Sequence, residues 1–174
     1  MLVVVSLAAW NGVDFFLAPN VAARVLFSET ANGSRRERIL AAGVMRNRIG
    51  NPAFGNLPTL KAVVQQHGAF SCIGDSNNAN WRKTGHPGQM TPAERAVWEE
   101  CLACVNGHIP PAIGPSGRPL VYYHDKSIGK PASWDNAQWR AVREESTEHF
   151  VFYSIVPTEP WHRWLPTPSA KSPK

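Results

Sequence analysis

The spacing of apolar residues predicts a helix over residues 20–31, and Glu29 stands out within it. The apolar residues recur at the three-and-four spacing of one helical face, at Ala22, Val25 and Leu26. One further step along that face falls on Glu29, and the Asn-Gly pair at 32–33 is a stop signal. We therefore expect a carboxyl group that points inward from the last turn of a helix.

Local start and stop signals predict three more helices. Capping boxes, in which Ser or Thr is followed three residues later by Glu, open helices at 34–50 and 91–107, and a glycine ends each. A shorter helix is expected at 59–68. The segment 69–90 is rich in Gly, Asn, Ser and Asp, and we interpret it as a long loop. Long ordered loops in compact domains commonly carry function.

The last third of the chain has a different pattern. Residues 119–124 and 149–156 are rich in β-branched and aromatic side chains, which predicts two strands that pair antiparallel. We expect the stretch between them, 133–145, to be partly helical. The predicted fold class is therefore α+β, a mostly helical domain over 1–156 with a small antiparallel sheet. A Pro-rich, basic tail follows at 157–174.

The composition is typical of a folded protein, and the net charge favours an anionic partner. The 174 residues are 43% hydrophobic and 18% charged, with a net charge of +5. The basic residues are scattered and form no long Lys/Arg run, which argues against a nucleic-acid partner. The apolar start, residues 1–10, is too short to span a bilayer and has no Lys or Arg before it. We interpret it as the first element of the domain and not as a signal peptide.

Three cysteines allow one disulfide. Cys101 and Cys104 lie one helical turn apart, an arrangement that rarely closes on itself, so we expect a Cys72–Cys101 bridge and a free Cys104. The alternative is a zinc ion held by these three thiols and His108. Structural zinc sites usually pair two close-spaced ligand sets, and Cys72 has no such neighbour but His67. We expect no metal ion and no cofactor.

Five short motifs occur in order along the chain. They are Ala23–Glu29, Ala42–Arg48, Gly68–Cys72, Leu120–His124 with Pro131 and Trp134, and His149–Tyr153. In this order and spacing they resemble cell-wall hydrolases of the spore-cortex-lytic-enzyme type. The resemblance spans roughly Val21 to Tyr153. The sequence departs from the family at 32–36, where it is more basic than the usual acidic continuation.

The resemblance implies a lysozyme-like fold and cleavage of the β-1,4 bond between N-acetylmuramic acid and N-acetylglucosamine, with Glu29 as the catalytic acid. Burial and the carbonyl end of a helix both disfavour a negative charge. Both effects favour a carboxylic acid that is still protonated near neutral pH, as a glycosidase requires to protonate a leaving sugar oxygen.

We expect five further residues to bind the glycan strand: Phe70, Ser71, Asp75, Tyr123 and Trp134. Each has a structural alternative. Phe70 can belong to the core, Ser71 can cap a turn, and Asp75 can form an Asx-turn with the Asn residues after it. Because side chains alternate across a strand, only one of Tyr123 and its neighbour His124 can face a groove.

Two questions stay open at this stage. A second catalytic carboxylate has three candidates, Asp75, Asp125 and Asp135, so the sequence does not separate a muramidase from a lytic transglycosylase. The alternative from another functional class is a non-catalytic module that binds cell wall or nucleic acid through Trp81, Trp134 and the Arg residues. Glu29 is then structural.

The expected partner is the glycan strand of peptidoglycan, with no nucleic acid and no membrane insertion. The expected place of action is the bacterial periplasm or cell wall. Without a convincing signal peptide, we expect export by a leaderless route or delivery into target cells. An antibacterial effector of this kind requires a periplasmic immunity or inhibitor protein as a second partner. A phage endolysin is a further leaderless alternative.

Overall fold

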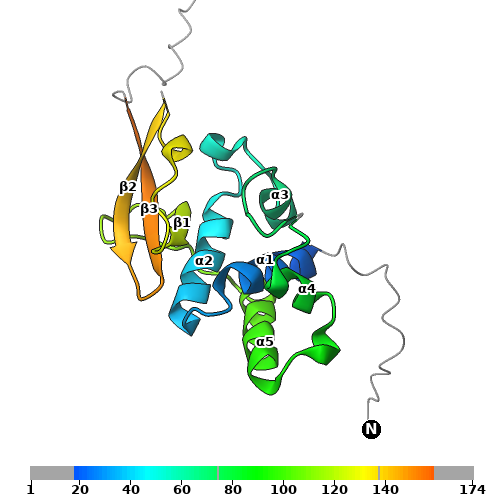
Figure 1. Cartoon of the computed structure of the whole chain (residues 1–174). Coiled ribbons are helices and arrows are strands. Elements are labelled where there is room, and N and C mark those ends of the chain that lie inside the picture. Colours follow the sequence, from blue (N-terminus) through cyan, green and yellow to red (C-terminus); the bar gives the residue numbers. More distant parts are fainter. Residues whose placement is uncertain (1–17, 74, 137, 159–174) are drawn as a thin grey trace, which may run out of the picture. The chain divides into compact units, whose positions relative to one another are not determined.

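A computed structural model describes residues 18–73, 75–136 and 138–158 (Figure 1). The chain divides between Ala112 and Ile113 into two compact units. The first unit is helical and the second contains a β-sheet, so the α+β class predicted from the sequence is confirmed. The predicted first element, 1–10, and all of the predicted tail except 157–158 lie outside the described residues. The single functional domain over 1–156 stays a prediction.

The helical unit is built around α1. Its helices are α1 (Ala18–Thr30), α2 (Arg35–Asn47), α3 (Leu60–Gln65), α4 (Ala79–Thr84) and α5 (Pro92–Asn106), with 3-10 turns η2 (Pro52–Phe54) and η3 (Pro87–Gln89). The four other helices all pack against α1, α5 most extensively (Figure 1). Every residue from Val21 to Thr30 except Glu29 is buried. A helix buried on all sides forms the centre of a core.

The predicted capping boxes are confirmed at both helices. The Ser34 hydroxyl accepts the Glu37 N–H at the start of α2, and the Glu37 carboxylate accepts the Ser34 N–H at 2.6 Å. Thr91 and Glu94 form the same reciprocal pair at the start of α5. Because each box satisfies backbone donors that the helix itself leaves unpaired, both starts are fixed by local sequence.

The prediction of a loop throughout 69–90 is wrong, because the segment contains α4 and η3. The Asn78 side chain accepts the Trp81 N–H at 2.8 Å and so caps the start of α4. Six residues are fewer than two helical turns, too few to show an apolar period. The Gly and Asn content of the segment therefore concealed a short helix.

The described residues of the second unit form three strands, β1 (Tyr122–Asp125), β2 (Trp139–Ser146) and β3 (Phe150–Pro157). They form an antiparallel sheet in the order β1-β3-β2, and the pairing of β1 with β3 confirms the predicted pairing of 119–124 with 149–156. The prediction that 133–145 is partly helical missed a strand. The described residues of this stretch contain the end of the 3-10 turn η4 (Ala132–Trp134) and most of β2, and no α-helix.

Tertiary pairing explains why 133–145 is not helical. The stretch is rich in Ala, Arg and Glu, which favour helices, but β2 pairs with β3 along its whole length. The Asp135 carboxylate accepts the Ala141 N–H at 2.8 Å and fixes the entry into the strand. A register shift between Arg143 and Glu145 makes Glu144 a bulge residue.

Candidate functional site

Glu29 is the half-buried residue of an otherwise buried stretch of α1. It lies in the last turn, where the Thr30 hydroxyl donates to the Leu26 carbonyl at 2.6 Å. Arg38 fixes the same helix end, since its guanidinium donates to the carbonyls of Thr30 and Gly33 and to the Glu100 carboxylate. The carboxyl group of Glu29 therefore stands at the edge of the core on a rigid support.

The loop after α3 reaches the Glu29 carboxylate. Its Oε1 atom accepts hydrogen bonds from the Ser71 hydroxyl and from the Cys72 backbone N–H, both at 3.3 Å. The structure thus brings together two predicted site residues that lie 42 positions apart in sequence. Among the described residues, none donates a hydrogen bond to the other oxygen, Oε2. One oxygen is held and the other is available to a ligand.

Phe70 and Asp75 lie on either side of this contact in the sequence, and both make contacts that are explained by a structural role. Phe70 is 7% exposed, and the Arg48 guanidinium lies 5.2 Å from its ring centroid. The exposed Asp75 carboxylate accepts the Asn77 N–H at 2.8 Å, which is the Asx-turn expected from the sequence. A role for either residue in glycan binding stays a prediction.

All three cysteines are free thiols, so the predicted Cys72–Cys101 disulfide is not formed in the structure. The two buried thiols have different neighbours. The charge of Glu29 acts on Cys72, whereas the charges of Arg38 and Glu100 and the thiol of Cys104 act on Cys101. Within the described residues, no three Cys, His, Asp or Glu side chains gather in a way that could hold a metal ion.

The pKa values of the cysteines fit thiols and not thiolates. Burial raises the pKa of Cys72, and the negative charge of Glu29 raises it further. Burial also raises the pKa of Cys101 to about 12. The role of Cys72 beside Glu29 was missed by sequence reasoning, because the thiol had been assigned to the disulfide. The adjacent Ser71 was the only signal for it.

Trp81 is held by a buried arginine. The Arg24 guanidinium lies 3.9 Å from the centroid of the Trp81 ring and donates to the Trp81 carbonyl and the Thr84 hydroxyl. Burial lowers the pKa of Arg24. This arginine of α1 is only 8% exposed and fastens α4 to the core. Such a buried side chain does not fit the ligand-binding role that the alternative functional class gives to the Arg residues.

The remaining predicted site residues belong to the β unit. Tyr123 packs against Phe150 and Phe152, whereas His124 donates to or accepts from the Tyr153 hydroxyl at 3.0 Å. The two neighbours thus face opposite sides of the sheet, as strand alternation requires. Trp134 stacks on Tyr122 with ring centroids 4.5 Å apart. Glycan contacts of Tyr123 and Trp134 stay predictions.

Asp125 and Asp135, two candidates for a second carboxylate, make local hydrogen bonds. Asp125 accepts the Ser127 N–H at 2.7 Å, which lowers its pKa. Asp135 pairs with Lys130 at 2.6 Å, and this bond is the main cause of its lowered pKa. These bonds account for the placement of both side chains in the β unit. A catalytic role for either stays a prediction.

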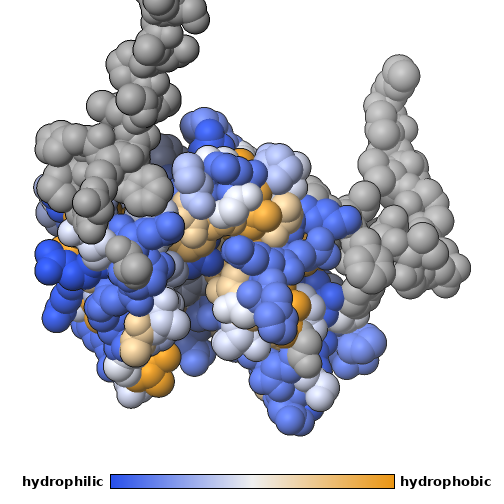
Figure 2. All heavy atoms as spheres, turned by 90° about the horizontal axis from the view of Figure 1, so that it is seen from above, coloured by the Kyte–Doolittle hydropathy of each residue, from blue (hydrophilic) through white to orange (hydrophobic). Residues whose placement is uncertain are grey.

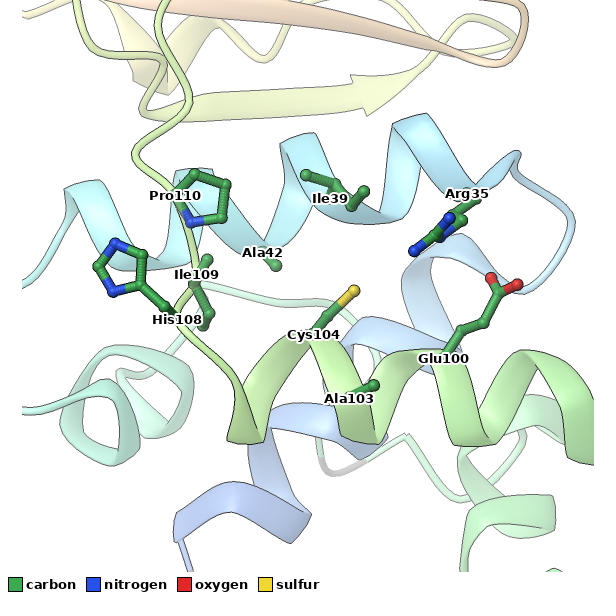
Figure 3. Close-up of a pocket in the computed structure, with 9 residues that line it drawn as sticks. All are labelled: Arg35, Ile39, Ala42, Glu100, Ala103, Cys104, His108, Ile109 and Pro110. Carbon is green, nitrogen blue, oxygen red and sulfur yellow. The ribbon is translucent and has the colours of Figure 1, made fainter.

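A cavity of about 260 Å³ opens between α2 and the end of α5 (Figure 3). The lining residues, which do not include Glu29, are Arg35, Ile39, Ala42, Glu100, Ala103, Cys104, His108, Ile109 and Pro110. The Cys104 side chain points from α5 toward α2 (Figure 3). On the face seen in Figure 2, hydrophilic residues cover most of the surface and apolar ones form small groups.

Comparisons with known proteins assign no family. No known family matches the chain, and no match is found among the curated proteins or the solved structures. In the described part of the chain, no helix combines the length and apolar character needed to cross a membrane.

Proposed function

We propose that this chain is a peptidoglycan hydrolase that cleaves the β-1,4 bond between N-acetylmuramic acid and N-acetylglucosamine, with Glu29 as the general acid. The observation that carries the proposal is the Glu29 carboxyl group. It is half-buried at the edge of the core, and a loop from 42 residues away holds one of its oxygens. The resemblance of the five motifs supplies the substrate class.

The arrangement suits proton donation. A general acid must be held within hydrogen-bond reach of the leaving oxygen, and its rotamer must not change between encounters with substrate. Ser71 and Cys72 fix Oε1. A proton on Oε2 is then directed at the glycosidic oxygen while positive charge develops on the sugar that is cut.

Contacts between the motifs support the resemblance in part. The first motif, which ends at Glu29, touches the third at Ser71 and Cys72. In the second motif, the Asn47 side chain donates to the Ala112 carbonyl at 2.7 Å, outside the five motifs. Two of the five motifs, distant in sequence, thus meet at the end of α1.

The proposal covers two chemical outcomes. Attack by water gives a reducing muramic acid end, whereas attack by the muramic acid's own hydroxyl gives an anhydro product. The masses of the released fragments differ by one water molecule, so mass spectrometry of a digest of purified sacculi identifies the reaction.

The first prediction concerns Glu29→Gln, which keeps the side-chain shape and removes the transferable proton. We expect clearing of purified sacculi to fall by at least about a hundredfold, the scale of general-acid catalysis. Glu99→Gln is the matched control, since this exposed residue of α5 should leave clearing unchanged. Turbidity measures the rate, and circular dichroism confirms folding.

Two outcomes contradict the proposal. Clearing by Glu29→Gln within a few-fold of the parent removes Glu29 from the reaction. Sedimentation of the parent protein with intact, uncleared sacculi supports the wall-binding module instead. If clearing occurs, the positive net charge of +5 would favour binding of the protein to an acidic wall polymer.

We also propose that the place of action is the periplasm or cell wall and that the protein serves as an antibacterial effector. A producing cell then requires an inhibitor, and the site around Glu29 is the natural target. An acidic or polar loop of such an inhibitor would be attracted by the positive net charge of +5.

A further inference from the structure

We propose that the cavity between α2 and α5 is a binding site for a small amphipathic carboxylic acid, an aromatic or short aliphatic monocarboxylate. The carboxylate of the ligand pairs with Arg35, and its apolar body lies between the two helices. The cavity belongs to the helical unit and its lining does not include Glu29. The inference is therefore independent of the proposed function.

Most of the cavity wall is apolar and comes from facing sides of two helices. Five apolar residues line it: Ile39 and Ala42 of α2, Ala103 of α5, and Ile109 and Pro110 of the segment after α5. The volume is about 260 Å³. An apolar cavity of about 150 Å³ is enough to bind benzene, and drug-sized ligands occupy about 300 Å³ or more. The cavity therefore fits a molecule with one ring and a short arm.

The segment after α5 is held against α2, which fixes one wall of the cavity. A Cβ atom at Gly43 would lie 2.7 Å from the Ala112 Cβ and 2.9 Å from the Pro110 carbonyl oxygen. Because no side chain fits at that distance, only glycine allows the two segments to approach so closely. The Asn47 amide also donates to the Ala112 carbonyl at 2.7 Å. The wall formed by 108–110 is therefore built into the fold.

One end of the cavity carries a positive charge that no neighbour balances. Figure 3 shows Arg35 and Glu100 at one end of the cavity and His108 at the other. The Glu100 carboxylate accepts two hydrogen bonds from the Arg38 guanidinium, at 3.0 and 2.7 Å, so its charge is compensated. Among the described residues, no salt bridge involves Arg35. A guanidinium binds a carboxylate in bidentate geometry, so this end favours an anionic head group.

Other ligands fit this arrangement less well. A cation would be repelled by Arg35, and a purely apolar molecule would leave the guanidinium without a partner. The described residues offer no cluster of Cys, His, Asp or Glu side chains that could hold a metal ion. An apolar lining with a few polar groups that fix orientation is typical of small-molecule sites.

Titration of the full chain with phenylacetate, followed by the NMR signals of backbone amides, tests the site. Phenylacetamide is the neutral control, since it has the same ring and arm and lacks the charge. We expect both to shift the amides of the lining residues, and phenylacetate to bind about tenfold more tightly, the scale of a hydrogen bond between charged groups. Equal affinities, or shifts that map outside the cavity, overturn the inference.

Substitutions separate the charged end from the apolar wall. Arg35→Gln should weaken binding of phenylacetate about tenfold and affect phenylacetamide much less. Arg36→Gln is the matched control, because it removes the same charge one residue away and Arg36 does not line the cavity. Ala103→Leu fills the cavity with a good helix former and should weaken both ligands. Equal effects of Arg35→Gln and Arg36→Gln, or full binding by folded Ala103→Leu, contradict the site.

Cys104 gives a second readout that needs no substitution. It lines the cavity and is half-buried, whereas Cys72 and Cys101 are 0% exposed. Iodoacetamide should therefore label Cys104 first. Phenylacetate at ten times its dissociation constant should slow this labelling about tenfold, because only the empty site reacts. Mass spectrometry of the labelled peptides measures the rate, and a rate that phenylacetate does not change overturns the inference.

The proposed function and this inference are tested separately. Glu29→Gln should bind phenylacetate as the parent does, since Glu29 does not line the cavity. If Glu29→Gln still clears sacculi, the proposed function is wrong and the binding measurements are unaffected. If Glu29→Gln weakens phenylacetate binding as much as Arg35→Gln does, the ligand occupies another site and the inference is wrong.

Discussion

At the scale of single residues, two glutamates show how hydrogen bonding separates a structural carboxylate from a candidate acid. Both oxygens of Glu144 are occupied. Ser116 and Ser154 donate hydroxyl hydrogen bonds to Oε1 at 2.6 Å, and the Ser116 N–H donates to Oε2 at 3.2 Å. Glu29 accepts at one oxygen only from the described residues. We therefore propose chemistry for Glu29 and an anchoring role for Glu144.

The surroundings of Glu144 predict a pH-dependent stability. Burial alone raises its pKa, but hydrogen bonds from Ser116 and Ser154, with the charge of Arg118, outweigh burial and lower the pKa below its usual value. A carboxyl group with a lowered folded-state pKa stabilises the fold above its unfolded pKa, about 4.3 for Glu. This stabilisation is lost as the pH falls through the folded-state value.

We expect Glu144→Gln to lower the free energy of unfolding of the β unit by about 2 kcal/mol at pH 7, the scale of hydrogen bonds to a charged group. The difference from the parent should shrink at a lower pH, below the folded-state pKa of Glu144, where the parent carboxyl group is protonated as well. Urea titrations followed by NMR signals of β2 and β3 measure both values. Glu148→Gln, at an exposed position, is the control. A difference that is the same at both pH values contradicts the assignment.

At the scale of helices and strands, what could be predicted depended on where the stabilising contacts lie. The capping boxes of α2 and α5 use residues three positions apart, so the sequence displays them. By contrast, β2 depends on β3, which no local pattern reveals. The short α4 depends on a single Asn cap and on Arg24 from α1. The two elements that were missed, α4 and β2, are thus both held in part by residues distant in sequence.

The same distinction holds for the candidate site. The apolar stripe of α1 placed Glu29 at the core edge, and the five-motif resemblance nominated Ser71, which the structure finds at its carboxylate. The predicted disulfide is not formed in the structure, and cysteine spacing alone does not show which neighbours a thiol has. The Cys72 N–H donates to the Glu29 carboxylate, and this follows only from the folded arrangement.

The dependence of α4 on its cap gives a prediction at this scale. Asn78→Ala removes the side-chain acceptor of the Trp81 N–H, and loss of such a cap costs about 1 kcal/mol. We expect hydrogen exchange of the Trp81 amide to accelerate about fivefold. Asn77→Ala is the matched control, since Asn77 contributes its backbone N–H, which alanine retains, to the Asx-turn. Equal exchange in the two variants would show that packing on α1 alone holds α4.

At the scale of the whole molecule, the proposed substrate determines where the protein should be toxic. Peptidoglycan lies outside the cytoplasmic membrane, so a folded wall hydrolase is harmless to a bacterium while it stays in the cytoplasm. A positive net charge of +5 leaves nucleic acids as the competing target inside the cell. The compartment in which the protein kills therefore distinguishes the two classes of function.

We expect a bacterium to lyse when the chain is expressed behind a fused secretion leader, and to grow normally when the same chain is expressed without one. The leader fused to Glu29→Gln is the control, because it carries the same export load and lacks the proposed acid. Culture density and release of wall fragments measure the outcome. Toxicity confined to the cytoplasmic form would contradict the wall substrate, since the protein and the glycan would then never meet. Lysis by the exported Glu29→Gln variant would instead show that binding or export stress kills the cell, and that the carboxyl group of Glu29 is not required.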